Sequence, residues 1–351
     1  MYIREARPED GQELQELEAR CPAGTTLIVS RVNTPDFFAR AKAYEHWKVF
    51  VACEDDEILG SGACAIRDGL VGGKLCRVGY QFQAFTDPDR RRQGVAGVFH
   101  RHIEDYLTSE GVALSYLVIV EGNIPAVRLV EGYGFEPHRT LVMPGLALYQ
   151  EMDVPSSGTI RPVSSNDLPA IADLLNDTWE GYELYAPASV ESLARFVERT
   201  PHYGFDNLLV LEDQGQFLAC LGFWDWSKIT QITVLSLSRK MRMRGVLADV
   251  MRPLRPTPRV PQSGETLRQM VLTPMGFKDV LYLGVLLRYV NNQAVRMGIG
   301  SIFCVCERDH PLLRSTKGFM RIDTSIHLYV KPLQEGVAMG DGPVFVDGID
   351  L

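Results

Sequence analysis

Alternating apolar and polar positions predict a strand at residues 79–86, in the first half of the chain. Asp87-Pro88-Asp89 ends this strand, because proline has no N–H to donate to a sheet and restricts the residue before it. Apolar residues then recur at helical spacing over 98–107, and 113–120 is a continuous apolar run, typical of a buried strand. A short helix is expected at 125–133. The pattern therefore predicts a strand–helix–strand–helix unit.

The same patterns predict a sheet built around this unit. Its remaining elements are strands at 2–7, 47–53, 58–66 and 141–149 and helices at 8–19 and 36–44.

The second half of the chain repeats the first. Residues 159–163 (TIRPV) mirror 2–6 (YIREA), and alternating segments at 207–212 and 216–224 repeat the earlier hairpin. A helix is predicted at 286–297 and a strand at 301–307. We interpret the chain as two tandem copies of one fold. The predicted divisions are a first domain at 1–150, a polar linker at 151–158, a second domain at 159–333 and a C-terminal tail at 334–351.

The turn from strand to helix at residues 91–97 carries candidate chemistry. The free N–H groups at a helix start, with the positive end of the helix dipole, bind anions. Gly94, Ala96 and Gly97 have little or no side chain, so a phosphate can approach the backbone closely. Arg91 and Arg92 add positive charge. The turn therefore predicts a phosphate-binding loop.

Two correctly spaced motifs in the first 150 residues resemble the GNAT superfamily of acyl-CoA N-acyltransferases. Arg91-x-x-Gly94-x-Ala96 is similar to the pyrophosphate loop R-x-x-G-x-G/A of that family. After an intervening strand, the family pattern N-x-x-A-x-x-L-Y-x-x-x-G-F is matched by Asn123, Ala126, Leu129, Gly134 and Phe135. The resemblance implies an α+β fold, in which each copy is a mixed, mostly antiparallel sheet flanked by helices.

The resemblance also implies acetyl-CoA as co-substrate and assigns its binding residues. Backbone amides around residues 82–85 would hold the pantetheine arm and polarise the thioester carbonyl, and those of 92–97 would hold the pyrophosphate. Asn123 would contact the cofactor arm, cap the helix that follows, or do both. The implied cofactor-binding residues are Phe85, Thr86, Arg91, Arg92, Gln93, Gly94, Val95, Ala96, Gly97, Asn123 and Ala126.

Acyl transfer to an amine needs a base for the ammonium proton and an acid for the leaving thiolate. Many family members carry a tyrosine acid where this chain has Val130, so Tyr133, one helical turn on, is the candidate acid; the alternative is a core aromatic. Gln83 stands where relatives often carry a glutamate base, which leaves the base unidentified or a water. Alternation predicts that Gln81 and Gln83 share one polar face of the strand.

The second copy is predicted to have lost its cofactor loop. The corresponding segment, 277–284, lacks the arginine and presents the bulky residues Val280, Leu281 and Tyr282. Residues 242–245 have a similar composition, but the prolines between Pro253 and Pro261 interrupt the chain where a helix should continue.

Composition narrows the class of protein. The 351 residues are 46% hydrophobic and 23% charged, as in ordinary globular proteins, and the net charge of −8 argues against a nucleic-acid partner and suits a cationic amine. No apolar run is long enough for a membrane span, and no signal peptide is recognised, so a cytoplasmic protein is expected. The seven scattered cysteines are predicted to be reduced, with Cys304 and Cys306 packed in the core. No metal site is predicted, since His100 and His102 point to different helix faces.

The resemblance to the GNAT superfamily implies an N-acetyltransferase that moves an acetyl group directly from acetyl-CoA to the amine of a small molecule or amino-acid-like compound. The alternatives are a non-catalytic acyl-CoA sensor and an acetyltransferase of protein N-termini or lysines. The identity of the amine and the oligomeric state stay open. Five aromatic residues of the second half are expected to pack its core or to line a shared substrate cleft: Trp179, Tyr182, Tyr185, Trp224 and Trp226.

Overall fold

The computed structural model describes residues 1–24, 26–251 and 256–350. The first half contains the strands β1 (Tyr2–Glu5), β2 (Leu27–Asn33), β3 (His46–Glu54), β4 (Glu57–Val71), β5 (Lys74–Thr86), β6 (Leu114–Val120) and β7 (Glu136–Ala147), and the helices α1 (Gly11–Ala19), α2 (Val95–Ser109) and α3 (Ile124–Gly132).

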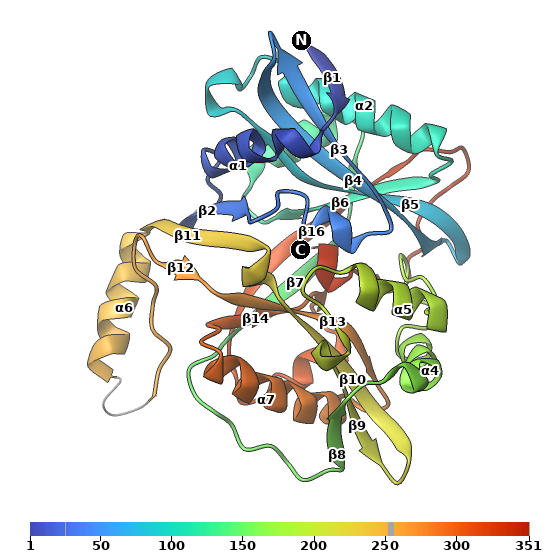
Figure 1. Ribbon diagram of the computed structural model, residues 1–351, viewed down its shortest axis with the longest axis vertical. Coiled ribbons are helices and arrows are strands. Elements are labelled where there is room, and N and C mark those ends of the chain that lie inside the picture. Colours follow the sequence, from blue (N-terminus) through green and yellow to red (C-terminus); the bar gives the residue numbers. More distant parts are fainter. Residues whose placement is uncertain (25, 252–255, 351) are drawn as a thin grey trace.

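The second half is built in the same style (Figure 1). Its strands are β8 (Thr159–Pro162), β9 (Leu208–Asp213), β10 (Gln216–Asp225), β11 (Thr230–Leu237), β12 (Thr266–Leu267), β13 (Gln269–Phe277), β14 (Ser301–Phe303), β15 (Cys306–Glu307) and β16 (Met320–Pro332), and its helices are α4 (Leu168–Thr178), α5 (Val190–Arg199), α6 (Arg239–Met251) and α7 (Val280–Arg296).

One large sheet runs through both halves, because the halves exchange strands. Its order is β1-β3-β4-β5-β6-β16-β7-β14-β13-β10-β9-β8, with β15 also paired to β7. Thus β16 of the second half lies between β6 and β7 of the first, and β7 lies between β16 and β14. The β7–β16 pair is antiparallel and runs from Glu136↔Val330 to Ala147↔Met320. The predicted boundaries at residues 150 and 159 stay a prediction, but the sheet does not divide there.

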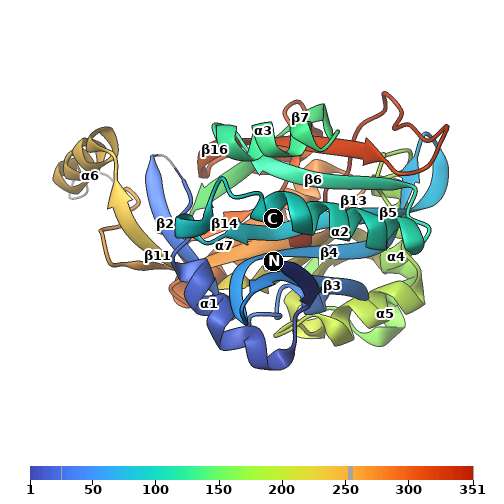
Figure 2. The same cartoon turned by 90° about the horizontal axis from the view of Figure 1, so that it is seen from above.

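Helices cover both faces of the first half of this sheet (Figure 2). Four apolar residues of α2, one per helical turn, are buried against one face: Val95, Phe99, Ile103 and Leu107. On the other face, Leu14 and Leu17 of α1 join a separate core that continues into the second half.

Several predicted elements differ from those observed. The expected helix at 36–44 is a series of turns that ends in a 3-10 turn, Ala41–Ala43. Its residues 37–41 are all buried, so the segment fills the core instead of presenting one apolar stripe. The strand expected at 301–307 is split into β14 and β15, and the helix expected at 286–297 starts earlier, at Val280.

The segment predicted as a tail enters the centre of the molecule. Val344, Val346 and Ile349 are buried in the same core as α1, and the 3-10 turn Gly348–Asp350 lies at the junction of the two halves. Residues 344–350 of the predicted tail are therefore part of the core.

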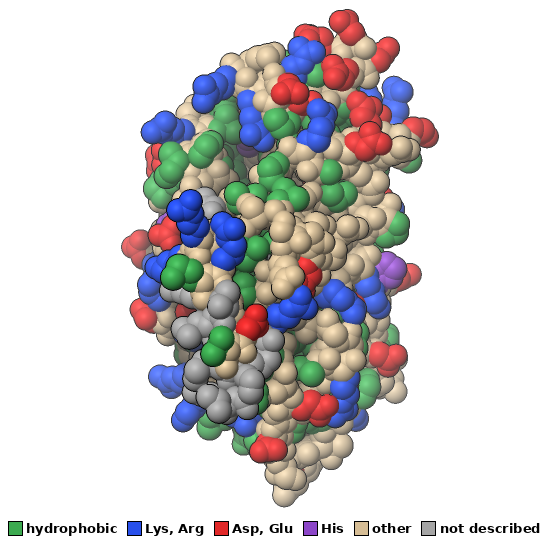
Figure 3. All heavy atoms as spheres, turned by 90° about the vertical axis from the view of Figure 1, so that its left-hand side faces the viewer, with side chains coloured by type: hydrophobic (Ala, Val, Ile, Leu, Met, Phe, Trp, Pro, Cys, Tyr) green, Lys and Arg blue, Asp and Glu red, His purple; other side chains and the backbone are tan. Residues whose placement is uncertain are grey.

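An arm formed by β11, β12 and α6 extends from the left-hand side of the molecule (Figure 1), and β11 pairs with β2 of the first half. Figure 3 shows Lys and Arg side chains around this arm, where Arg239, Lys240 and Arg242 are exposed. Residues 242–245 lie inside α6 and not in a strand-to-helix turn, so they form no phosphate loop. Pro253, one of the prolines used in that prediction, lies outside the described residues.

All seven cysteines are free thiols, and Cys304 and Cys306 are buried in the core of the second half, as predicted. In the described part of the chain, no helix is both long and apolar enough to cross a membrane.

Candidate functional site

The site is organised around the point where β5 and β6 separate. These parallel strands pair only from Val78–Tyr80 to Leu114–Tyr116. Beyond Tyr80, β5 continues to Thr86 beside β4, and a register shift between Ser61 and Ala63 marks a β-bulge. Gln83 lies in this bulge with a φ of 51°, in the left-handed region. The edge of β5 that faces away from β4 is thus unpaired by β6 along its last residues.

The predicted phosphate loop follows directly. Gly94 caps α2 with a φ of 85°, and Arg92 also has a positive φ, of 63°. Within the described residues, the backbone N–H groups of 91–96 donate to no protein acceptor, whereas those of Gly97 and Val98 both bond Gly94 O. Successive free N–H groups at a helix start form an anion-binding concavity.

Space and charge at this loop fit a pyrophosphate. A Cβ built on Gly94 would meet nothing within 4 Å. Arg91 and Arg92 are exposed and form no ion pair with the described residues, whereas Arg90 is paired with Glu57 at 3.3 Å. Two guanidinium groups are therefore available to a bound anion.

Asn123 lies at the start of α3, where its Oδ1 accepts a hydrogen bond from Ala126 N at 3.4 Å. The capping role expected for it is confirmed, and the cofactor contact stays a prediction. Exposed apolar side chains flank it, since Val120 and Ile124 are each about half exposed.

Tyr133 packs between α3 and α2. Its ring stacks on that of His100 with centroids 5.6 Å apart, and its hydroxyl points at Gly97. Val130, at the family's usual tyrosine position, is buried against Leu117 and Ile119. The structure places Tyr133 beside the first turns of α2; its role as the acid stays a prediction.

His100 was not expected to be part of the site. Its Nδ1 lies 3.1 Å from Gln81 Oε1, and Gln81 in turn donates to Ser115 Oγ at 3.0 Å. Burial lowers the pKa of His100 to about 4, so its ring is neutral at pH 7. The sequence did contain a signal for His100. It lies three residues after Gly97, and this spacing puts His100 and Gly97 on the same face of α2, the face toward Tyr133.

The prediction that Gln81 and Gln83 share one face is wrong. Gln81 points to α2, but Gln83 Nε2 lies 3.5 Å from Phe37 O, on the opposite side of the sheet. The bulge adds a residue to β5, so side chains beyond it are turned to the other face.

A chain of hydrogen bonds links Gln83 to a buried carboxyl group, that of Glu18. Phe37 O also accepts from Asn33 Nδ2 at 3.3 Å, and Asn33 N donates to Glu18 Oε2 at 2.8 Å. Burial raises the pKa of Glu18 to about 7. No sequence motif marks Glu18, because it lies on α1, distant in sequence from β5.

Three buried polar atoms near the bulge lack a partner among the described residues: Ser61 Oγ, Gln83 Oε1 and Arg40 Nε. The Arg40 guanidinium lies 4.9 Å from the centroid of Phe82 and 5.6 Å from that of Trp226, and it donates to Tyr80 OH at 3.2 Å. Unsatisfied buried polar groups are costly, and they gather at binding sites.

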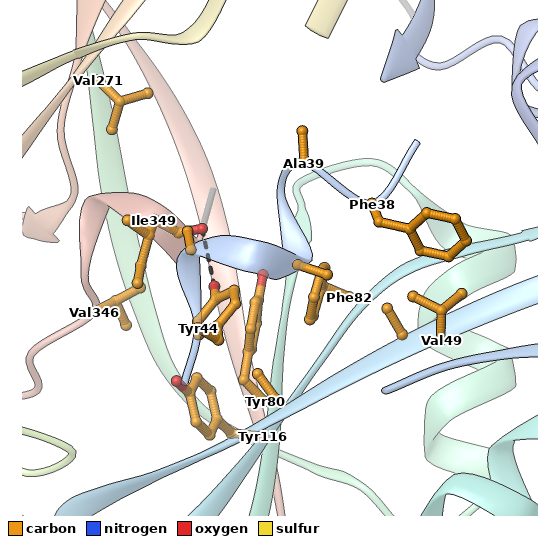
Figure 4. Packing of buried hydrophobic residues seen from close by; sticks show 14 of the residues in the cluster. Phe38, Ala39, Tyr44, Val49, Tyr80, Phe82, Tyr116, Val271, Val346 and Ile349 are labelled. Atoms are coloured by element: carbon orange, nitrogen blue, oxygen red, sulfur yellow. Dashed lines mark hydrogen bonds between the residues drawn. The ribbon is translucent and has the colours of Figure 1, made fainter. Parts of the chain in front are cut away.

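Three tyrosine hydroxyls bond Asp350, which is fully buried at the strand junction. Figure 4 shows the rings of Tyr44, Tyr80 and Tyr116 close together, with the Tyr44 hydroxyl donating to the carbonyl oxygen of Ile349. Asp350 Oδ1 accepts from Tyr44 OH at 2.7 Å, and its Oδ2 accepts from Tyr116 OH at 2.9 Å and faces Arg67 Nη2 at 3.2 Å. Tyr80 OH donates to the backbone carbonyl of the same residue. Burial raises the pKa of Tyr80 to about 12, so the hydroxyl keeps its proton. This centre joins the two halves.

The corresponding segment of the second copy, residues 277–284, lies largely in the first turns of α7. Asp279 caps this helix and accepts from Leu281 N at 2.8 Å. A carboxylate therefore occupies the helix start where the first copy has free N–H groups, and the Leu281 side chain is exposed.

The five aromatic residues of the second half divide into two groups. Trp179 and Tyr182 contact His310, and Tyr185 joins them through Phe345, whereas Trp224 and Trp226 pack together in the core shared with the first half.

Comparison with known proteins agrees with this architecture. Residues 12–135 match the family described as acetyltransferase (GNAT) family, and no curated protein matches the chain. In fold, the chain is similar to N-myristoyltransferase from Saccharomyces cerevisiae with bound myristoyl-CoA, at 10% identity and a TM-score of 0.65, over 94% of this chain and 77% of that one. It is also similar to a GCN5-related N-acetyltransferase from Anabaena variabilis, at 13% identity and a TM-score of 0.53, over 95% and 73%. The predicted fold class is confirmed.

Proposed function

Because residues 12–135 belong to the acetyltransferase (GNAT) family, and so to the N-acyltransferases that use acyl-CoA, we propose that this protein moves an acetyl group from acetyl-CoA directly to the amine of a small molecule or amino-acid-like compound. The loop at 91–97 carries the proposal. In the described part of the chain, the N–H groups of residues 91–96 have no acceptor, the space at Gly94 is open, and Arg91 and Arg92 form no ion pair.

The donor would bind along the unpaired edge of β5. The loop amides would hold the pyrophosphate, Asn123 would contact the arm, and the bulge at Gln83 would turn backbone groups toward the thioester carbonyl. Phe37 and Phe82 are both buried beside Gln83, so these rings would leave room only for a short acyl group.

Proton transfer is assigned to Glu18 and Tyr133. Glu18 is the proposed base, since a carboxyl group with a pKa of about 7 is half deprotonated at neutral pH. Gln83 is then a positioning residue, whose unpaired Oε1 would accept a hydrogen bond from the incoming amine. Tyr133 is the proposed acid for the thiolate.

The acceptor side is narrowed by the second half. Trp226 of the second half and Phe82 of the first both lie against the Arg40 guanidinium, so the second half would limit the room for the acceptor, which favours a small amine over a folded protein surface. Free thiols throughout the chain support a cytoplasmic location.

The test is release of free thiol from acetyl-CoA across a panel of small amines, amino acids and peptides. We expect release that depends on the amine, with an acetylated amine as product, and at least tenfold lower turnover with myristoyl-CoA. Thiol release that no amine increases, with acetyl-CoA tightly bound, would contradict the proposal and support a sensor.

A further inference from the structure

Two arginines lie beside the bulge of β5, where the proposed function places the acceptor amine. Arg40 belongs to the buried segment that precedes β3, and Arg31 belongs to β2. Neither forms an ion pair with the described residues. Two positive charges at this place repel an ammonium group, so a plain cationic amine does not match the site.

Arg40 is a buried cation without a carboxylate partner in the described part of the chain. Its residue is only 7% exposed, and its Nε has no hydrogen-bond partner there. The guanidinium donates to Tyr80 OH at 3.2 Å and lies against the rings of Phe82 and Trp226. Buried charges in proteins are paired or bind a ligand. The unpaired charge of Arg40 therefore indicates an anionic ligand nearby.

The fold directs Arg31 toward the same place. Side chains two positions apart on a strand share a face, and on this face Asn33 donates to Phe37 O, the atom that Gln83 Nε2 also approaches. The residue opposite Arg31 on β11 is Ile232, which is buried in the core that contains α1. This face of β2 thus points inward. Arg31 is nevertheless exposed, so the core is open to water at this point.

The pKa shifts of this group agree with that placement. Desolvation by the surrounding protein and the charge of Arg40 lower the pKa of Arg31, although Arg31 is exposed. Burial raises the pKa of Glu18 to about 7, against the opposing effects of Asn33 N and of both arginines. Arg31, Arg40 and Glu18 therefore lie close enough to interact, and Arg31 is open to water but partly surrounded by protein.

Nearby carboxylates do not balance the two arginines. Glu18 is about half protonated at neutral pH, because its pKa is raised to about 7. The other carboxylates around the site have cations of their own: Asp350 is paired with Arg67, Asp225 with Arg268 and Asp36 with Lys42. Two arginine charges therefore face one carboxyl group that is only partly ionised. A ligand with a single negative charge would restore the balance.

We propose that the acceptor is an amine that also carries a carboxylate, as an amino acid does, and that Arg31 binds this carboxylate. The inference rests on the proposed function and narrows it. A guanidinium binds a carboxylate through two parallel hydrogen bonds, which fix its direction as well as its position. The charge of Arg40, held in the core, adds to the attraction. The amine of the acceptor then lies toward Gln83 and Glu18.

The test compares each L-amino acid with its own amide in the thiol-release assay. The amide keeps the amine and the shape and removes the negative charge. Its amine also loses a proton more readily, so amine basicity by itself favours the amide. We expect kcat/KM to be at least tenfold higher for the acid. Equal values, or higher values for the amides, would overturn the inference and still leave an acetyltransferase.

Variants assign the preference to Arg31. Arg31→Gln should lower the ratio of acid to amide kcat/KM at least tenfold, and Arg31→Lys, which keeps the charge but not the fork, should restore part of it. Arg296→Gln, which breaks a surface pair with Glu151 on α7, is the matched control and should keep the ratio. An unchanged ratio in Arg31→Gln, with or without a loss of acetyl-CoA affinity, would overturn the assignment.

A binding measurement separates this inference from the proposed function. N-acetylglycine and N-acetylglycinamide are titrated into the full chain with CoA bound, and their affinities are measured by ligand-observed NMR. We expect saturable binding of N-acetylglycine, at least fivefold tighter than that of the amide, with the difference lost in Arg31→Gln. Equal affinities, or no saturable binding of N-acetylglycine, would overturn the carboxylate site even in an active acetyltransferase. A chain that shows the expected difference but acetylates no amine would keep this site and contradict the proposed function alone.

Discussion

The Tyr133 hydroxyl packs so closely on Gly97 that a Cβ built on this glycine would lie 1.7 Å from it. The sequence suggested that Gly97 was small to let a phosphate approach. The structure gives a different reason: Gly97 makes room for an aromatic side chain that joins α3 to α2. Any change at Gly97 therefore acts through Tyr133.

Gly97→Ala tests this contact by the sign of its effect on stability. In the wild type, the new methyl group displaces Tyr133 from His100, and we expect a loss of about 1–3 kcal/mol in unfolding free energy. In a Tyr133→Ala background the space is free, and the same change should stabilise the helix by about 0.5–1 kcal/mol. Urea unfolding of the four proteins measures both values. Equal effects in the two backgrounds would contradict the contact.

Gly94→Asp tests the phosphate loop. It places a carboxylate where the pyrophosphate is expected, so acetyl-CoA affinity should fall at least tenfold, or about 1.4 kcal/mol, by calorimetry. The backbone strain at positive φ should cost only about 1–2 kcal/mol of stability. Gly215→Asp, at a positive-φ hairpin glycine that is equally open, is the control and should bind normally. Unchanged affinity in Gly94→Asp would refute the loop.

The strand-to-helix turn at 91–97, our proposed phosphate loop, could be placed from the sequence because its evidence is local. Glycines, arginines and a strand-to-helix turn lie within a few residues, and the structure places them as one unit at the start of α2. The Asp350 centre could not be predicted, since Tyr116 and Asp350 are 234 residues apart in sequence. The hydrophobic pattern of neither segment indicates that Tyr116 and Asp350 meet. It also does not indicate that β7 and β16 are exchanged between the two halves.

The position of Gln83 shows a second limit of prediction from sequence. Alternation along a strand assumes an uninterrupted pleat, and one bulge moves the following side chains to the other face. The sequence identified Gln83 as a residue of the site but assigned it the wrong face. Glu18 could not be found from the sequence, because its raised pKa comes from burial in the folded protein and no motif marks it.

Glu18 predicts a pH dependence of activity. If it is the base, turnover should rise as the carboxyl group loses its proton near pH 7, the value to which burial raises its pKa. Glu18→Gln should lower the rate constant by about 10²–10⁴-fold. Glu16→Gln, an exposed change on the same helix, should leave it unaltered. A Glu18→Gln enzyme with wild-type turnover would exclude the base role.

The same group predicts a pH dependence of stability. Its pKa is raised on folding, from 4.5 to about 7, so between these values the folded protein binds more protons than the unfolded chain. Stability should therefore fall as pH rises through this window, by up to about 3 kcal/mol. Glu18→Gln should remove this fall and be the more stable protein at pH 8. Parallel stability–pH curves for the two proteins would contradict the raised pKa.

The second copy is predicted to bind no acetyl-CoA, because Asp279 satisfies the start of α7. Calorimetric titration of the whole chain should therefore saturate at one equivalent, and Gly94→Asp should weaken that binding at least tenfold. Two equivalents, or full binding retained in Gly94→Asp, would place a cofactor on the second half.

Tyr133→Phe separates an enzyme from a sensor. The change keeps the ring on His100 and removes only the proton donor. If Tyr133 is the acid, the rate constant should fall by about 10²–10³-fold, acetyl-CoA affinity should hold, and the alkaline limb of the pH–rate profile should vanish. Tyr133→Phe with nearly normal turnover would leave Tyr133 as packing, with a stability change of about 1 kcal/mol at most.

A wild type that binds acetyl-CoA and acetylates no amine would favour the sensor, in line with Val130 at the usual tyrosine position. The free amides of the loop favour neither function, since a sensor needs them as well. The polar atoms of Gln83 and Arg40 that lack a partner among the described residues argue for the enzyme, because a sensor has no use for them. Gln83→Leu therefore completes the test. It removes the unpaired amide but leaves the loop intact, so an enzyme should lose turnover at unchanged acetyl-CoA affinity, and a sensor should be unaffected.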